Sequence, residues 1–357
     1  MTKNIAYALA VLLSALALPA SGASDEQEQP AEYRVDLNKG VWLKGPSLPS
    51  ARQDAAAAVI ADRIYLVGGF GPHDRQMSST LVFEPAVATE FDTQDRGGPI
   101  VPHVGEWTYA ANIPEPVDHA AAAGLDGYLY VAGGRIENLV SNKFWRYDPI
   151  DDQWVEMPSM PYPRYGATMQ AFDGKLYLIG GQSSHGNDEQ SLMIFDPQTS
   201  EWRSKPYELG IERIASASAV IGNRIALVGG RNRDEINLSA CELFDPVRDR
   251  WSACSHLHEA RSGFGLAVVN NRMVAIGGED LLRDSCTQTS EISEDNGYGW
   301  MNGPWLPFPR HGMAVVTVGQ TVWVIGGTSY VGTAPIDGVL RFVSPVVKVK
   351  FRGRARK

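Results

Sequence analysis

The chain has 357 residues, of which 44% are hydrophobic and 20% are charged, and its formal net charge at pH 7 is -9. It contains 36 glycines, 22 prolines and 9 tryptophans, a composition that favours an all-β protein with many turns. The acidic balance argues against nucleic acid as the main partner, because phosphate binding needs a basic surface.

Residues 1–23 have the pattern of a secretory signal peptide. A lone Lys3 precedes an apolar run from Ile5 to Leu18, and small residues follow at Ser21 and Ala23. The run is too short to span a membrane. We therefore expect cleavage after Ala23, a disordered leader at residues 24–31, and a protein that is secreted or periplasmic.

Six copies of one pattern follow, each with a tryptophan and, 26 or 27 positions later, a glycine pair. The tryptophans are Trp42, Trp107, Trp154, Trp202, Trp251 and Trp300, and the pairs begin at Gly68, Gly133, Gly180, Gly229, Gly277 and Gly326. Successive pairs are 47 to 49 residues apart, except for a first interval of 65. The excess is an insertion between Phe83 and Trp107, around residues 86–105.

The runs before the glycine pairs, such as LYLIGG, are short and apolar, which predicts strands buried on both faces. A period near 50 with a glycine pair and spaced aromatic residues resembles the kelch repeat. The resemblance covers residues 33 to 343 and implies a six-bladed kelch-type β-propeller. We place this propeller at residues 32–345 and a basic C-terminal tail at residues 346–357.

The two ends of the repeat array are each incomplete. Trp42 has no preceding strands, and the last copy has a strand at Val339–Val343 but no tryptophan. We expect the strand around Trp42 to complete the last blade and to close the ring, which removes both sheet edges. The alternative is that Val346–Phe351 supplies this outer strand. The tail KVKFRGRARK is either a solvated segment or a tether to anionic surfaces.

Two of the three cysteines are predicted to form a disulfide. If Phe244 pairs with Trp251 across a hairpin, Cys241 faces Cys254 in the same register. The alternative is a slipped register with two buried thiols. Cys286 is then a free thiol, and no cysteine or histidine spacing is typical of a metal site, so we expect no metal and no cofactor.

Arginines recur at two positions of the repeat, before the innermost strand and directly after the glycine pair. They are Arg52, Arg135, Arg164, Arg213, Arg231, Arg261 and Arg310. Propeller geometry brings both positions to one rim of the axial channel, where guanidinium groups can grip a carboxylate or sulfate. The alternative for the recurring arginines is structural pairing with loop carbonyls or acidic neighbours between blades.

Three titratable residues on the same loops are candidates for acid–base catalysis, namely His119, His311 and Glu279. A histidine beside an anion-binding arginine can donate or accept a proton near neutral pH. The alternative for either histidine is a solvated side chain without a catalytic role.

One stretch extends the resemblance to an enzyme family. Residues 49–71, PSARQDAAAAVIADRIYLVGGFG, are similar to the opening blade of periplasmic N-acetylneuraminate epimerases, the sialic acid mutarotases, with Arg52 at its core. This resemblance implies a sugar carboxylate held by rim arginines while His311 and Glu279 move protons between ring oxygen and anomeric hydroxyl. A copper oxidase of the galactose oxidase type is a remote alternative, because the chain has no adjacent Tyr–His pair for its metal site.

Binding without turnover is the function that needs the fewest assumptions about individual residues. We predict an exported module that recognises an anionic glycan or an acidic peptide at the arginine-lined axial rim. The alternative is a mutarotase of the N-acetylneuraminate epimerase type. The insertion at residues 86–105 links two outer strands, which favours an interaction arm over a lid.

Overall fold

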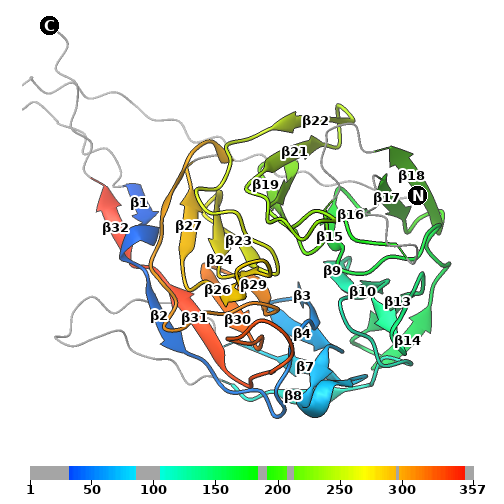
Figure 1. Cartoon of the computed structure of the whole chain (residues 1–357). Helices are drawn as coiled ribbons and strands as arrows, with labels where there is room; N and C mark the ends of the chain where they lie inside the picture. The colour runs from blue at the N-terminus through cyan, green and yellow to red at the C-terminus, as the bar shows by residue number, and fades with distance from the viewer. Residues whose placement is uncertain (1–31, 86–104, 184–190, 207–212, 295–296, 350–357) are drawn as a thin grey trace, which may run out of the picture. The chain divides into compact units, whose positions relative to one another are not determined.

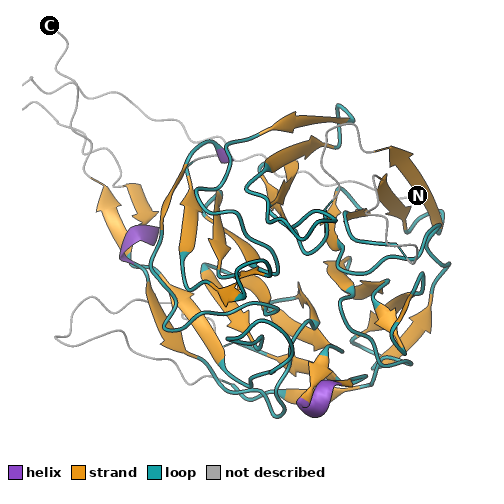
Figure 2. Cartoon of the chain, in the orientation of Figure 1, coloured by secondary structure: helices purple, strands orange, loops and turns teal. Residues whose placement is uncertain are grey.

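The computed structural model describes residues 32–85, 105–183, 191–206, 213–294 and 297–349. These residues form β-strands and two 3-10 helices, η1 (Leu37–Lys39) and η2 (Pro72–Asp74). The predicted signal peptide and leader, nearly all of the insertion after Phe83, and the end of the basic tail lie outside the described residues. Figure 2 shows how strongly strands and loops dominate the fold.

Six four-stranded antiparallel sheets form the blades of a propeller, which confirms the predicted fold (Figure 1). From the axis outward, blade 1 is β3 (Ala56–Ile60), β4 (Arg63–Val67), β7 (Thr80–Phe83) and β8 (Thr108–Ala110). Blade 2 is β9 (Ala121–Leu125), β10 (Tyr128–Ala132), β13 (Phe144–Asp148) and β14 (Gln153–Glu156). Blade 3 is β15 (Thr168–Phe172), β16 (Lys175–Ile179), β17 (Ser191–Asp196) and β18 (Glu201–Pro206).

The second half of the ring follows the same order. Blade 4 is β19 (Ala217–Ile221), β20 (Arg224–Val228), β21 (Cys241–Asp245) and β22 (Arg250–Ala253). Blade 5 is β23 (Gly265–Val269), β24 (Arg272–Ile276), β27 (Ser290–Ser293) and β28 (Trp300–Asn302). Blade 6 is β29 (Ala314–Val318), β30 (Thr321–Ile325), β31 (Val339–Val343) and β2 (Val41–Lys44). Each innermost strand contacts the innermost strands of both neighbouring blades, so the ring is closed.

Blade 6 combines the two ends of the array, as predicted. Strand β2 pairs with β31 so that Trp42 lies opposite Phe342, and the two rings are 4.9 Å apart between centroids. The alternative outer strand is wrong, because β32 (Val346–Val349) pairs instead with β1 (Glu32–Val35). The described residues from 35 to 347 form one compact unit, and residues 32–34 with 348–349 belong to a second unit.

The repeated tryptophans connect neighbouring blades. Each of five indole Nε1 groups donates a hydrogen bond to a loop carbonyl of the preceding blade, over distances of 2.8 to 3.1 Å. The donor–acceptor pairs are Trp42–Pro304, Trp107–Pro46, Trp154–Ala111, Trp202–Pro158 and Trp300–Ser255. A buried indole needs such an acceptor, and here the acceptor fixes the spacing between blades.

The innermost strands surround an axial cavity of about 330 Å³. Each blade contributes three consecutive residues to its wall, such as Ala57–Val59 from β3, and none of the lining side chains is charged. Each innermost strand pairs on one side only, so its free backbone groups face the axis. The wall therefore favours water over an apolar ligand, and charged groups occur only beyond its ends.

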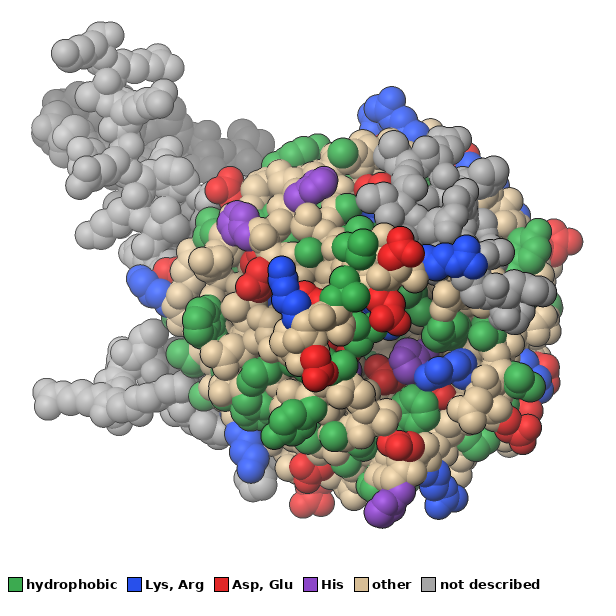
Figure 3. Space-filling model, viewed as in Figure 1, with side chains coloured by type: hydrophobic (Ala, Val, Ile, Leu, Met, Phe, Trp, Pro, Cys, Tyr) green, Lys and Arg blue, Asp and Glu red, His purple; other side chains and the backbone are tan. Residues whose placement is uncertain are grey.

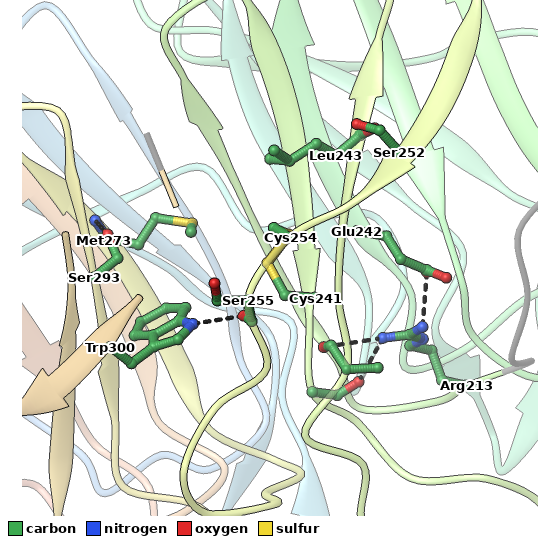
Figure 4. The surroundings of a disulfide bond; sticks show 12 residues. Arg213, Cys241, Glu242, Leu243, Ser252, Cys254, Ser255, Met273, Ser293 and Trp300 are labelled. Atoms are coloured by element: carbon green, nitrogen blue, oxygen red, sulfur yellow. Dashed lines mark hydrogen bonds and ion pairs between the residues drawn. A yellow bond between two sulfur atoms is a disulfide. The ribbon is translucent and has the colours of Figure 1, made fainter. Parts of the chain in front are cut away.

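Cys241 and Cys254 form a disulfide between β21 and β22, in the register that pairs Phe244 with Trp251. The alternative of two thiols in a slipped register does not apply. Figure 4 shows the bond between the Arg213–Glu242 ion pair on one side and Trp300 on the other. The disulfide thus links the two outer strands of blade 4 covalently.

We expect the double substitution Cys241→Ser with Cys254→Ser to lower the free energy of unfolding by roughly 2–4 kcal/mol, because a closed loop of this size restricts the unfolded chain. Urea unfolding followed by circular dichroism measures the change. Cys286→Ser removes the remaining thiol and serves as the control. Equal stability of the double variant and the native chain would contradict the expectation.

Candidate functional site

Six residues close a ring of backbone hydrogen bonds at the end of the axis where the innermost strands begin. They are Asp54, His119, Gly166, Ala215, Gly263 and Gly312. Each amide donates to the carbonyl of its counterpart in the preceding blade, over 2.8 to 3.1 Å, and Asp54 donates to Gly312 to complete the circle. We call these residues the axial ring.

All six residues of the axial ring have a left-handed backbone, with φ between 51° and 63°. Glycine adopts this conformation without strain, and aspartate and histidine are among the few other residues that tolerate it. Only Asp54 and His119 bring a reactive side chain to the ring, and they are adjacent in it. The axial ring itself is therefore polar on one side only.

Residues next to the ring pair with the residues that directly follow the glycine pairs. The bridges are Gln53 with Phe70, Asp118 with Arg135, Tyr165 with Gln182, Ile214 with Arg231, Ser262 with Glu279, and His311 with Thr328. This pairing brings the predicted residues His119, Arg135, Arg231, Glu279 and His311 to the same end of the propeller. On the face in Figure 3, acidic, basic and histidine side chains lie beside one another near the middle.

Five of the seven predicted arginines do not line the opening. We call Arg52, Arg164, Arg213, Arg261 and Arg310 the repeat arginines, and they are at most 2% exposed. Each donates from Nη1 to a backbone carbonyl where its blade bends, for example to Gly68 at 2.8 Å from Arg52 and to Gly277 at 2.8 Å from Arg261. These five arginines make the carbonyl contacts of the structural alternative, and their guanidinium groups do not line the surface of the opening.

Arg135 and His119 instead reach solvent above two carboxylates. Arg135 lies on β11 (Arg135–Ile136), and its Nε and Nη2 are each 2.8 Å from Oδ1 of Asp118. His119 Nδ1 is 2.6 Å from the same oxygen, and its Nε2 is 3.6 Å from Oδ2 of Asp54. The side chain of Asp118 is 0% exposed and that of Asp54 16%, against 24% for His119 and 28% for Arg135. A ligand arriving from solvent therefore meets mainly the two cations.

Neighbouring loops hold this cluster in place. Gln76, on β6 (Arg75–Gln76) of blade 1, donates to Oδ2 of Asp118 and to the carbonyl of Arg135 at 3.2 Å. The Arg135 guanidinium carbon is 5.7 Å from the ring centre of Phe70 and 5.2 Å from that of Tyr165. Sequence reasoning missed Gln76, because the residues at its position in the corresponding hairpins of blades 2 and 5 are Val140 and Cys286.

Arg231, Glu279 and His311 form a second cluster across blades 4 to 6. Arg231 Nη1 is 2.9 Å from Glu279 Oε1, and His311 Nδ1 is 3.1 Å from Glu279 Oε2. The other His311 nitrogen, Nε2, is 2.7 Å from the carbonyl of Tyr330. The side chains of His311 and Glu279 are 5% and 9% exposed. The predicted catalytic pair is thus brought together, but both nitrogens of His311 are engaged and the pair is buried.

The comparisons with known proteins agree with this fold. A family model for the kelch-repeat domain of KLHDC2, KLHL20 and DRC7 matches residues 105–278. Kelch-like protein terF of Aspergillus terreus is 25% identical over 95% of this chain and 74% of its own length. The solved structure of YjhT covers 83% of this chain and 96% of that chain, with a TM-score of 0.68 and 19% identity. The chain is a kelch-repeat β-propeller.

Other relatives of this kelch propeller are longer proteins. Beta-scruin of Limulus polyphemus is 25% identical over 74% of this chain, and mouse kelch-like protein 36 is 22% identical over 76%. The chain spans only 28% of the first and 43% of the second. The likeness to these proteins therefore concerns their kelch region.

Few other groups in the kelch propeller are suited to chemistry. In the described part of the chain, no cluster of three or more His, Cys, Asp or Glu side chains could hold a metal ion. Burial raises the pKa of the Cys286 thiol to about 11, so it stays protonated at neutral pH. No helix among the described residues is long and apolar enough to cross a membrane.

The electrostatics of the His119 cluster favour a protonated imidazole. Burial lowers the pKa of His119, but the carboxylates of Asp54 and Asp118 outweigh burial and raise the pKa above its ordinary value of 6.5. Burial raises the pKa of Asp118, but hydrogen bonds from His119 and Gln76 and the charge of Arg135 bring it below 3.8. Below the raised pKa of His119, the solvent-facing part of the cluster carries two positive charges.

We expect the substitution His119→Asn to cost most stability at acidic pH. A raised folded-state pKa stabilises the fold below the unfolded value of about 6.5, and this stabilisation is lost as pH rises through the folded value. Urea unfolding between about pH 5 and about pH 9 should show the difference from the native chain shrinking with rising pH.

His73→Asn is the matched control, because His73 is exposed and also has a left-handed backbone, with φ of 61°. A His119→Asn difference that stays constant with pH, or that grows as pH rises, would contradict the assigned protonation state.

Proposed function

We propose that this kelch propeller is an exported binding module for an anionic glycan or an acidic peptide, with Arg135 and His119 as the groups that receive the ligand's anionic group. The supporting observation is that these two cations are partly exposed while Asp118, which contacts both, is completely buried. Charged hydrogen bonds from such cations are stronger than neutral ones. We thus assign the ligand's anionic group to one Arg–His pair and not to the predicted ring of seven arginines.

The surroundings of Arg135 suit a ligand with a carboxylate beside a ring. Arg135 uses Nε and Nη2 for Asp118, and its Nη1 has no hydrogen-bond partner among the described residues. Tyr165 places an aromatic ring under the guanidinium and a hydroxyl that bonds Gln182. Because Asp118 already holds the guanidinium and Gln76 holds Asp118, binding would cost little side-chain entropy.

Export of the module is part of the proposal. The disulfide between Cys241 and Cys254 supports it, because such bonds persist mainly in oxidising compartments. The N-terminal pattern of residues 1–23 points in the same direction. The mass of the mature protein checks it: a chain beginning at Ser24 is expected, and a retained N-terminus would contradict cleavage.

We expect Arg135→Gln to weaken binding of N-acetylneuraminate about 10- to 100-fold, because a hydrogen bond to a charged group contributes roughly 1.5–3 kcal/mol. Titration calorimetry at about pH 6 measures the dissociation constants. Arg283→Gln is the matched control, because Arg283 is 83% exposed and, among the described residues, its side chain bonds only to Asp280. Equal affinity of Arg135→Gln and the native chain would refute the assigned contact.

One observation favours mutarotation of an acidic sugar as a second candidate function. His119 Nε2 and Asp54 Oδ2 are 3.6 Å apart at the mouth, which places an acid beside a base. In this reaction His119 would protonate the ring oxygen as the ring C–O bond breaks, and Asp54 would take the proton of the anomeric hydroxyl. Re-closure from the other face with the reverse transfers completes the exchange. The acid–base pair is then His119 with Asp54 rather than His311 with Glu279.

If the propeller is a mutarotase, freshly dissolved N-acetylneuraminate should equilibrate between anomers faster with the native chain than with buffer, as followed by proton NMR. Asp54→Asn keeps a side chain that tolerates the left-handed backbone, and it should lower the rate about 100-fold or more. Saturable binding without any acceleration would leave the binding module as the function and exclude the mutarotase.

A further inference from the structure

The repeat arginines provide an internal comparison of one buried position in several blades. In blade 1, Arg52 Nη2 donates to Ser79 Oγ at 2.5 Å. In blade 4, Arg213 Nη2 is 2.7 Å from Glu242 Oε2, and in blade 5, Arg261 Nη2 is 2.8 Å from Glu291 Oε1. Each of these guanidinium groups thus meets a side-chain oxygen from the third strand of its blade or from the residue just before it.

Blade 6 lacks such an oxygen. The strand register makes Gly338 the counterpart of Ser79, because Val339 and Thr80 each pair with the last residue of the preceding strand. The same register makes Leu340 the counterpart of Glu291. Neither glycine nor leucine has a side-chain acceptor, so the blade that contains Arg310 offers only the Gly338 carbonyl, 3.0 Å from Nη1.

Arg310 is therefore a buried cation without a counter-ion among the described residues. It is 0% exposed, and its Nε and Nη2 have no hydrogen-bond partner in the described part of the chain. Burial lowers its pKa to about 10, which still leaves it charged at neutral pH. The Phe308 ring lies 4.7 Å from its guanidinium carbon and offsets part of the cost. A buried charge needs hydrogen-bond acceptors or a partner of opposite sign, because desolvation alone is expensive.

Gly338 borders Nη2 of Arg310 and brings no side chain to it. This residue is partly exposed, and a Cβ built on it would lie 3.4 Å from Arg310 Nη2 and 3.7 Å from Ile336 Cδ1. A small group can therefore lie beside the guanidinium without displacing the main chain. We propose that Arg310 holds a small monovalent anion such as chloride in blade 6, in the place that a protein oxygen occupies in blades 1, 4 and 5.

Thermal unfolding in sodium chloride and in sodium gluconate at equal ionic strength tests the site. Gluconate is too large to enter beside Gly338, so the native chain should have a higher Tm in chloride. Above the dissociation constant, each tenfold increase in chloride should raise the folding equilibrium constant about tenfold. Equal Tm values in the two salts would overturn the proposal and leave water as the partner of Nη2.

Comparing Gly338→Ser with Gly338→Ala distinguishes an anion bound at Arg310 from a general effect of salt on stability. Serine supplies the oxygen that Ser79 supplies in blade 1, so Gly338→Ser should lose the chloride effect and unfold at a higher temperature in gluconate than Gly338→Ala. Crystals grown with sodium bromide should show an anomalous peak beside Arg310 in the native chain and none in Gly338→Ser. A chloride effect that persists in full in Gly338→Ser would place the anion elsewhere and contradict the assignment.

Discussion

Backbone hydrogen bonds between neighbouring blades are the constraint on which this structure depends. The second glycine of each pair donates to the next blade, as Gly134 does to the carbonyl of Arg164 at 2.8 Å and Gly327 to that of Arg52 at 2.6 Å. The first glycine has no room for a side chain, because a Cβ at Gly133 would lie 2.2 Å from the Arg164 carbonyl oxygen. The glycine pairs recur because the adjacent blade fills the space that a side chain would need.

The same contacts decide which residues can act on a ligand. The residue after each repeat arginine pairs with the residue after a glycine pair, and the following residue enters the axial ring. Four of the six ring positions are glycine or alanine, so the polar groups of Asp54 and His119 stand out on one side of the mouth. The fold thus gives every blade the same backbone geometry at this end of the axis. The few side chains that differ between blades determine which groups can act on a ligand.

The regular part of the molecule could be predicted from the sequence, because one period repeats six times and Trp42 lacks a blade of its own. The register of one hairpin was enough to pair Cys241 with Cys254. The direction of a side chain could not be predicted in this way: Arg52 and Arg135 both belong near the rim by spacing, yet the first is buried against Gly68 and the second reaches solvent. Gln76 had no signal, since it acts across a blade boundary and the corresponding hairpin positions in blades 2 and 5 are Val140 and Cys286.

The central claim is that the Asp118–His119–Arg135 corner of the axial mouth receives an anion. The most direct measurement is NMR chemical-shift mapping of the labelled chain during titration with N-acetylneuraminate at about pH 6. The account predicts that the largest saturable shifts occur at His119, Arg135 and Tyr165, with small shifts in the turns at the opposite end of the blades. Saturable shifts that centre on those opposite turns, or on the far side of the mouth around Arg231, would contradict it.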